Sequence, residues 1–246
     1  MLTELCILTP MAILYMANVI SLNTIVIFIL LVYWLPKFIF INTLERLCPS
    51  VLTRNVHSQS VALTFDDMPY GSHETIISTL DKHNMKGTFF IISGDITEAN
   101  INIFVNAVKS GHQLANHGKT NSMHFLKDKN ELTKEIMHCD TMIKDIYKIA
   151  SIPLPSKMLY RPGCGVFGPE MLKLVTDLGY QLALGSTYPN DPMIRSSWIN
   201  YWYIVNHIEK GDIVIMHDRS WTPDMLDNLL IWMNWQEMKS VTVEKL

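Results

Sequence analysis

The feature that most constrains the fold is a regular alternation of short apolar runs with longer amphipathic stretches, which starts at about Asn55 and continues to the C-terminus. Apolar runs of strand length lie at 61–65, 87–92, 113–115, 158–160, 180–184 and 212–216, with 241–243 as a further candidate. Helical patterns lie at 73–83, 103–110, 130–149, 170–178 and 225–235. Strands that alternate with helices indicate βα units, so we predict an α/β fold with a mostly parallel sheet or barrel.

The N-terminal part of the chain has a different composition, because no Asp, Glu, Lys, Arg or His occurs from Leu5 to Pro36. A helix needs about 20 mostly apolar residues to cross a bilayer core, and the stretch from about 20 to 41 meets this need. A buried pair of helices and a cleaved segment are the alternatives, although Glu4 stands where a signal peptide would be basic. We therefore predict a membrane anchor and linker at 1–54, with a single transmembrane helix, and a folded domain at 55–246.

The sequence leaves open on which side of the membrane the domain lies. Lys37, Arg46 and Arg54 follow the apolar segment, and by the positive-inside rule they favour the cytoplasm. The chain contains no Asn-x-Ser/Thr sequon that would argue for the opposite side.

The overall charge excludes one class of partner. A net charge of −3 and a pI near 6.3 give no basic surface for nucleic acid. The four cysteines lie far apart and show neither a CxxC pair nor a disulfide-rich framework.

Polar residues that can carry chemistry follow several predicted strands. Because active sites of α/β folds lie at the carboxyl ends of their parallel strands, such residues are expected to converge at one edge of the sheet. The residues in question are Asp66, Asp67, His117, Arg161, Asp191 and His217.

Each residue type suits a role at a hydrolytic site. One carboxylate of the Asp66–Asp67 pair can bind a metal ion while the other stays ionised as a base. His117 at a strand end can be a metal ligand, Arg161 can hold a carboxylate in its planar fork, and His217 can act as a general acid. Taken singly, each also has a plain structural explanation, such as a turn or a hydrogen-bonded buried histidine.

Two stretches beside these residues add candidates. His117 is followed by Asn121 at +4 and by His124 at +7. Seven residues of regular helix rise about 10 Å, so His124 could share a metal with His117 only if the loop folds back. After Arg161, Gly163 and Gly165 would let the backbone approach a ligand closely.

Four stretches occur in an order that resembles a known family. They are Thr64-Phe-Asp-Asp-Met-Pro69, Gly111-His-Gln-Leu-Ala-Asn-His117, Arg161-Pro-Gly-Cys-Gly165 and Gly211-Asp-Ile-Val-Ile-Met-His-Asp218. They are similar to TFDDGP, GHEIGNH, RPPYG and GSIVLLHD of the polysaccharide deacetylases with a NodB homology domain, carbohydrate esterase family 4. The resemblance runs from about His57 to the C-terminus. It implies a distorted (β/α) barrel and metal-dependent removal of N-acetyl groups from chitin-like glycans or peptidoglycan.

The resemblance also implies roles for individual residues. Asp66 would be the general base, oriented by Arg161, and His217 would be the general acid, tuned by Asp191. Asp67 and His117 would bind a divalent metal, usually zinc. The residues expected to line the sugar-binding wall are Tyr160, Gly163 and Cys164.

This chain departs from the family pattern at the metal. The family has a second histidine at the position of Asn121, so Asn121, His124 or water would be the third ligand. Met68 replaces a glycine, and Gly163-Cys164 replaces Pro-Tyr. We therefore expect a membrane-anchored N-deacetylase of a GlcNAc-containing glycan. A glycan-binding module without catalysis and an amidase for a small C–N substrate are the competing hypotheses.

Overall fold

The computed structural model describes residues 21, 23, 24 and 37–246. The chain divides into two compact units, 1–48 and 49–246, and the described part of the first contains helix α3 (Lys37–Leu47). Most of the predicted membrane span at 20–41 lies outside the described residues. Within the described ranges, no helix has the length and apolar character needed to cross a membrane.

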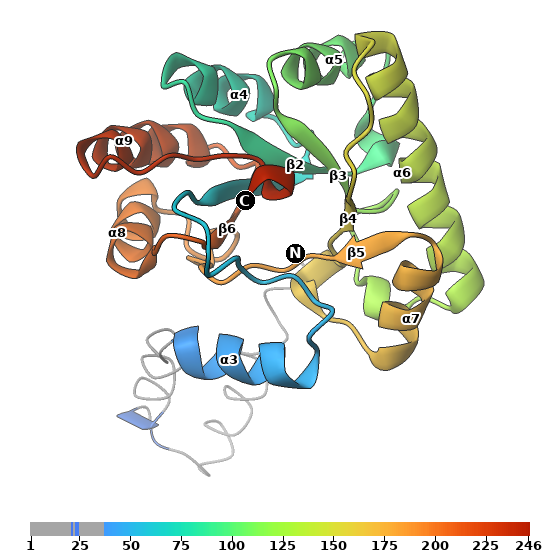
Figure 1. Ribbon diagram of the computed structural model, residues 1–246, viewed down its shortest axis with the longest axis horizontal. Helices are drawn as coiled ribbons and strands as arrows, with labels where there is room; N and C mark the ends of the chain where they lie inside the picture. The colour runs from blue at the N-terminus through green and yellow to red at the C-terminus, as the bar shows by residue number, and fades with distance from the viewer. Residues whose placement is uncertain (1–20, 22, 25–36) are drawn as a thin grey trace. The chain divides into compact units, whose positions relative to one another are not determined.

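The second unit is built on a six-stranded sheet in which every paired strand is parallel to its neighbour, in the order β5-β4-β3-β2-β1-β6 (Figure 1). The strands are β1 (Ala62–Met68), β2 (Gly87–Ile91), β3 (Gln113–Asn116), β4 (Met158–Tyr160), β5 (Tyr180–Leu182) and β6 (Ile213–His217). This is a parallel α/β half-barrel, in agreement with the predicted fold class.

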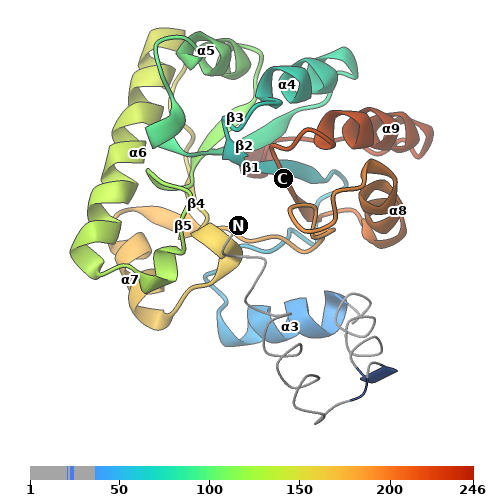
Figure 2. The same ribbon diagram turned by 180° about the vertical axis from the view of Figure 1, so that it is seen from behind.

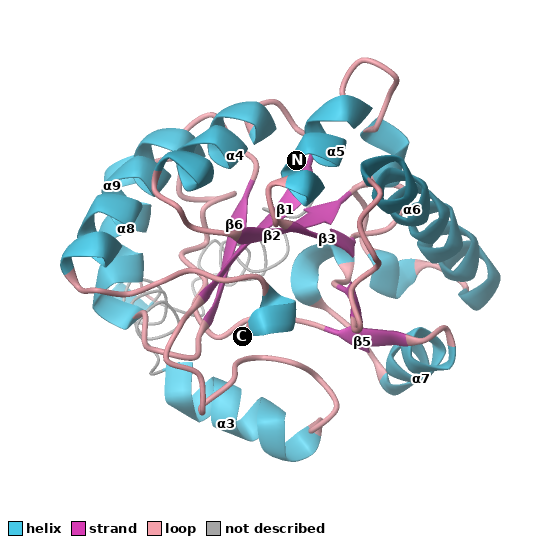
Figure 3. Ribbon diagram, turned by 45° about the horizontal axis from the view of Figure 1, so that its top comes forward, coloured by secondary structure: helices cyan, strands magenta, loops and turns pink. Residues whose placement is uncertain are grey.

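Helices flank the sheet and cover its outer side (Figures 2 and 3). They are α4 (His73–Lys82), α5 (Ile101–Lys109), α6 (Lys129–Ala150), α7 (Pro169–Asp177), α8 (Ser197–His207) and α9 (Thr222–Trp235). Their apolar stripes face inward, as in α4, where Ile76, Ile77 and Leu80 are buried. Helix α6, the longest among the described residues, is capped by Asp128, whose side chain accepts hydrogen bonds from the backbone N–H groups of Asn130 and Glu131.

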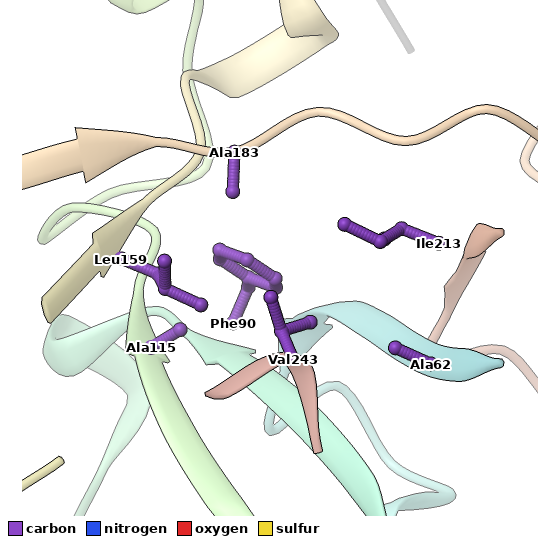
Figure 4. Close-up of a cluster of buried hydrophobic side chains, with 7 residues drawn as sticks. All are labelled: Ala62, Phe90, Ala115, Leu159, Ala183, Ile213 and Val243. Atoms are coloured by element: carbon purple, nitrogen blue, oxygen red, sulfur yellow. The ribbon is translucent and has the colours of Figure 1, made fainter. Parts of the chain in front are cut away.

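The chain beyond β5 links that end of the sheet to β6. Ser186 donates its backbone N–H to the Ile213 carbonyl, Ile215 donates to the Thr187 carbonyl, and Thr187 forms a parallel bridge with Val214. The enclosed interior is a layer of apolar side chains, to which each strand or its extension contributes (Figure 4). The layer consists of Ala62, Phe90, Ala115, Leu159, Ala183, Ile213 and Val243. This layer fixes the strands, and therefore their carboxyl ends, relative to one another.

The structure differs from the sequence expectations at three places. Helix α8 was not predicted, because its sequence is rich in aromatic residues without a clear polar face. The candidate last strand at 241–243 is instead extended chain that leads into a 3-10 helix at Val243–Lys245. The second compact unit starts at Pro49 rather than at residue 55, because Leu52 and Arg54 bridge to the chain after β5 and before β6.

Candidate active site

The carboxyl ends of four strands bring the predicted residues together. Asp66 and Asp67 lie at the end of β1, and His217 is the last residue of β6, where it pairs in register with Asp66. His117 and Arg161 directly follow β3 and β4, and these two strands are neighbours. The candidate site is therefore built on the rigid ends of the sheet.

Asp66 and Arg161 form a buried ion pair. Arg161 Nη1 donates to Asp66 Oδ1 at 2.6 Å and to Thr64 Oγ1 at 2.8 Å. The remaining guanidinium donors bind backbone carbonyls, Nε that of Ala183 at 3.0 Å and Nη2 that of Leu184 at 2.8 Å. Burial lowers the pKa of Arg161, and the Asp66 carboxylate opposes this change. Arg161 stays charged under these conditions and fixes the Asp66 carboxyl group in one orientation.

His217 is held by Asp191 in a comparable way. Its Nδ1 lies 2.9 Å from Asp191 Oδ1, and its backbone N–H donates to Asp191 Oδ2 at 2.8 Å. Burial disfavours the imidazolium, but the fully buried Asp191 carboxylate outweighs this effect and raises the pKa of His217. Asp191 therefore favours the protonated form of His217 and holds its Nδ1, which leaves Nε2 as the ring nitrogen not bound to Asp191.

Asp67 is placed by a distortion of β1. The register with β2 shifts between Phe65 and Met68, and Asp67 has a left-handed backbone with φ of 62°. This bulge gives successive carboxylates different directions, so that Asp66 faces Arg161 and Asp67 faces His117. Burial works against the charge on Asp67, but hydrogen bonding to His117 and nearby positive groups hold its pKa well below the usual range.

Asp67 and His117 are arranged as two ligands of one ion would be. Asp67 Oδ1 lies 3.5 Å from His117 Nε2, and two ligands at about 2.0–2.1 Å from a tetrahedral ion are about 3.4 Å apart. His117 Nδ1 is 2.8 Å from the Arg161 carbonyl, which fixes the tautomer that leaves Nε2 toward Asp67. Burial disfavours the charged form of His117, but the Asp67 and Asp66 carboxylates outweigh this effect and raise the pKa of His117.

The structure bears on one of the predicted third ligands, His124, whose ring nitrogens are both used within the protein. Asn121 is exposed in the loop after His117. His124 is fully buried, and its Nδ1 lies 2.7 Å from Tyr160 Oη and accepts from the Gly163 N–H at 3.1 Å. Its Nε2 lies 3.3 Å from the Thr120 carbonyl. Both ring nitrogens of His124 are thus used within the protein, which leaves no lone pair for an ion.

Burial reinforces the structural role of His124. Desolvation and the charge of His117 lower its pKa to about 4, so the ring is neutral at pH 7. In the ranges that the structure covers, no group of three or more His, Cys, Asp or Glu side chains could hold a metal ion. Asp67 and His117 could supply two ligands to an ion, and solvent or substrate would fill its remaining coordination positions.

Of the three residues expected to line the sugar-binding wall, Cys164 is exposed, while Tyr160 and Gly163 are buried. Cys164 is exposed and has a left-handed backbone with φ of 64°. Gly163 is buried against the loop after His117, because a Cβ there would lie 2.0 Å from the Ser122 carbonyl oxygen. Tyr160 has no exposed surface and binds His124, so the structure places it beneath the loop and not in contact with a substrate.

Asp218 and Arg219, which directly follow His217, were not among the predicted site residues. Asp218 accepts backbone N–H bonds from Tyr70, Gly71 and Ser72 at 2.6–3.1 Å, and so fixes the turn that follows Asp67. Arg219 Nη2 donates to Asp67 Oδ2 at 2.5 Å. The position of Asp218 directly after His217 could have indicated that Asp218 belongs to the site, whereas no sequence pattern indicates the same for Arg219.

Comparison with protein families supports this geometry. The family model described as polysaccharide deacetylase matches residues 53–183, which is more than half of the chain. The chain belongs to the polysaccharide deacetylase family. The matched part contains Asp66, Asp67, His117 and Arg161, while Asp191 and His217 lie beyond it.

Curated relatives include deacetylases of several glycans. The chain is 25% identical over 191 residues to the peptidoglycan-N-acetylglucosamine deacetylase PgdA of Listeria monocytogenes, covering 77% of this chain and 39% of the relative. It is 24% identical to a bifunctional xylanase/deacetylase of Pseudobutyrivibrio xylanivorans, with 79% and 31% covered. It is also 24% identical to the chitooligosaccharide deacetylase of Sinorhizobium fredii, with 69% and 76% covered. The match spans less than half the length of the first two relatives.

Solved structures show the same fold. The wild-type protein BA3943 of Bacillus anthracis, described as a family 4 pseudoenzyme, superposes with a TM-score of 0.70 at 22% identity, covering 82% of this chain and 70% of that one. The Bc1960 peptidoglycan N-acetylglucosamine deacetylase gives a TM-score of 0.71 at 21% identity, with 80% and 92% covered. At these identities the likeness establishes the fold, which both an enzyme and a pseudoenzyme share.

Proposed function

We propose that this protein is a hydrolase that removes N-acetyl groups from a GlcNAc-containing glycan. The observation that carries the proposal is the pairing of Asp66 with Arg161 and of His217 with Asp191, at positions in register on adjacent strands. A fixed base and a fixed acid beside the Asp67–His117 pair are what hydrolysis of an amide requires. The relatives' printed activities, on peptidoglycan and chitooligosaccharides, support the substrate class.

Asp66 is the proposed general base. Its Oδ1 is bound to Arg161 Nη1, so its second oxygen is the one that can accept a proton from the attacking water. Because Arg161 is itself held by two backbone carbonyls, Asp66 needs no reorganisation when water attacks.

His217 is the proposed general acid. The nitrogen of an amide leaves poorly as an anion, so a proton must reach it as the C–N bond breaks. Asp191 holds Nδ1 and raises the pKa of His217, which keeps the proton on Nε2 available for transfer. After the reaction, the proton taken by Asp66 and the one given by His217 balance each other.

Asp67 and His117 are the residues that would hold a divalent ion. Their facing oxygen and nitrogen atoms, 3.5 Å apart, are the support for this assignment. When bound, such an ion supplies polarisation of the acetamide carbonyl and activation of water. The identity of the metal, zinc in the sequence-based expectation, is part of the proposal.

A second candidate function is a glycan-binding module without catalysis. It is favoured by the exposed Asn121 in place of a histidine and by the use of both nitrogens of His124 inside the protein. The intact acid–base pairs argue against it, since two buried ion pairs are costly to keep without a use.

Acetate release distinguishes the two functions. The full chain, with added Zn²⁺ or Co²⁺, is incubated with chitin oligomers and with peptidoglycan fragments, and acetate is quantified. We expect release that depends on the metal and is abolished in His117→Ala, which should also lose bound metal. Binding of the glycans without acetate release under all metal conditions would instead establish the binding module.

We also propose that the uncharged segment from Leu5 to Pro36 attaches the enzyme to a membrane. The support is its length and lack of charge alone. Fractionation of cells that express the full chain, followed by extraction with carbonate and then with detergent, tests it. Extraction by carbonate without detergent would contradict the proposal.

A further inference from the structure

Arg219 is fixed against the metal side of the site by three contacts. Its Nη2 donates to Asp67 Oδ2 at 2.5 Å, and its Nη1 donates to the Asp218 carbonyl at 2.8 Å. The guanidinium carbon lies 4.4 Å from the centre of the Tyr70 ring, a cation–π contact. With 14% of its side chain exposed, Arg219 is held in place rather than free in solvent.

The two oxygens of Asp67 therefore face two different groups. Oδ1 faces His117 Nε2, where the proposed ion would bind, and Oδ2 carries the Arg219 guanidinium. Among the described residues, Asp67 is the carboxylate that faces His117, whereas Asp66 faces Arg161. His117 is a neutral ligand in its metal-binding form.

These ion pairs determine the charge around Asp66 and Asp67. Two carboxylates, Asp66 and Asp67, are matched by two guanidiniums, Arg161 and Arg219. The affinity of a protein site for a divalent cation depends on the negative charge of its ligands. A permanent positive charge on the same carboxylate reduces both that negative charge and the basicity of the ligand.

We propose that Arg219 is a built-in competitor of the divalent ion, which lowers the metal affinity of the Asp67–His117 pair. This inference rests on the proposed function, since it assumes that these two residues bind the metal. It goes further because it attributes a low metal affinity to Arg219, a residue that is not itself a metal ligand. In the opposite role, Arg219 would orient Asp67 for the metal. Removal of Arg219 would then weaken metal binding instead of tightening it.

Metal binding by the full chain tests the proposal independently of turnover. Isothermal titration with Zn²⁺ and equilibrium dialysis with Co²⁺ compare the unaltered chain with Arg219→Gln. We expect about tenfold tighter binding in Arg219→Gln, the size of effect that groups around metal ligands commonly have. Arg219→Lys keeps the charge and should stay close to the unaltered chain. Arg219→Met, which keeps the aliphatic stem, is the second neutral variant in case Arg219→Gln folds poorly.

Matched controls separate this effect from general changes of charge. Lys173→Gln removes one positive charge from the exposed Lys173–Asp177 pair on α7 and should leave metal affinity unchanged. Adding His117→Ala to Arg219→Gln should abolish the gained affinity, which ties it to this site. Circular dichroism verifies that each variant is folded.

The outcomes separate the inference from the function on which it rests. Equal or weaker binding in Arg219→Gln, with binding by the unaltered chain intact, overturns the role of Arg219 and leaves the metal site standing. If neither chain binds metal, the proposed metal site fails, and the role of Arg219 fails with it.

Discussion

The proposed acid–base half of the site (Asp66, Arg161, Asp191 and His217) and the proposed metal half (Asp67 and His117) are constructed differently. In the acid–base half, Asp66 and His217 each have a charged partner that is fully or almost fully buried. In the metal half, Asp67 and His117 face each other, but a cation already binds Asp67 and the usual second histidine is an exposed asparagine. The comparison indicates that the residues proposed for proton transfer keep their charged partners, whereas the residues proposed as metal ligands are the altered part of the site.

The difference follows from where the residues come from. The acid–base residues lie on strand ends or are bound to them, and the strands are fixed by the apolar layer inside the half-barrel. The residues after His117 belong to an irregular loop, which is held by side-chain contacts such as that of Thr120 with Glu135. A substitution in such a loop changes the metal side without disturbing the sheet.

The largest expected effect comes from the acid–base half. Asp66→Asn removes the base, so acetate release should fall by about 10²–10⁴-fold while metal binding is retained. The change also leaves Arg161 buried without its counter-ion, which should cost several kcal/mol of unfolding free energy, about 3–5 by analogy with other buried pairs.

Urea denaturation of Asp66→Asn, monitored together with acetate release and metal titration, separates these effects. Folded protein that binds metal but releases no acetate is the expected result. Undiminished turnover would refute the assignment of Asp66 as the base.

The second prediction concerns the pH dependence of the acid. Asp191 raises the pKa of His217, and the proposed reaction needs His217 protonated. Activity is therefore retained with rising pH until the pH exceeds the raised pKa of His217. Asp191→Asn removes the charge and should move the alkaline limb of the kcat profile down by about 1–3 pH units. Asp227→Asn, which removes a surface carboxylate beside His83, is the control that should leave the limb in place.

The third prediction sharpens the comparison by restoring the metal half. Asn121→His supplies an imidazole at +4 from His117 and should tighten Zn²⁺ binding by about tenfold, as measured by titration calorimetry. Ser122→His places the same ring one residue further along and should give no gain. An unchanged affinity in Asn121→His would mean that the loop does not bring position 121 toward His117.

The smallest effect on the site is expected from His112, which belongs to neither half. Its Nδ1 accepts from the Gly87 N–H at 3.0 Å, and burial lowers its pKa to about 4 despite the nearby Asp81 carboxylate. The unfolded chain takes up this proton near pH 6.5, before the folded chain does. Stability due to His112 is therefore present above pH 6.5 and lost as the pH falls toward 4, by up to roughly 3 kcal/mol.

Chemical denaturation at several pH values measures this loss. His112→Gln should flatten the profile between pH 6.5 and 4 and leave the metal affinity at pH 7 unchanged. An equally steep profile in His112→Gln would assign the acid sensitivity to other groups.

The sequence predicts the sheet and the strand ends better than it predicts the loops. The strands around Asp66, His117 and His217 are apolar runs with polar ends, and this pattern is local enough to be recognised. The contact of Arg219 with Asp67 joins residues that are far apart in the chain, and no periodicity encodes it. The role of His124 depends on a single 3-10 turn that brings its ring to Tyr160, and helix geometry alone places it elsewhere.

Residue 161 contributes to both halves, but through different atoms. Its guanidinium holds Asp66, whereas its main-chain carbonyl fixes the ring of His117 and its N–H continues the pairing of β3 with β4 through the Asn116 carbonyl. A point substitution can delete the first function and never the second, because every amino acid has that carbonyl. Mutation of such a domain can therefore act unequally on the two halves. One substitution at residue 161 removes the side chain that holds Asp66, while the backbone carbonyl that fixes the His117 tautomer is retained.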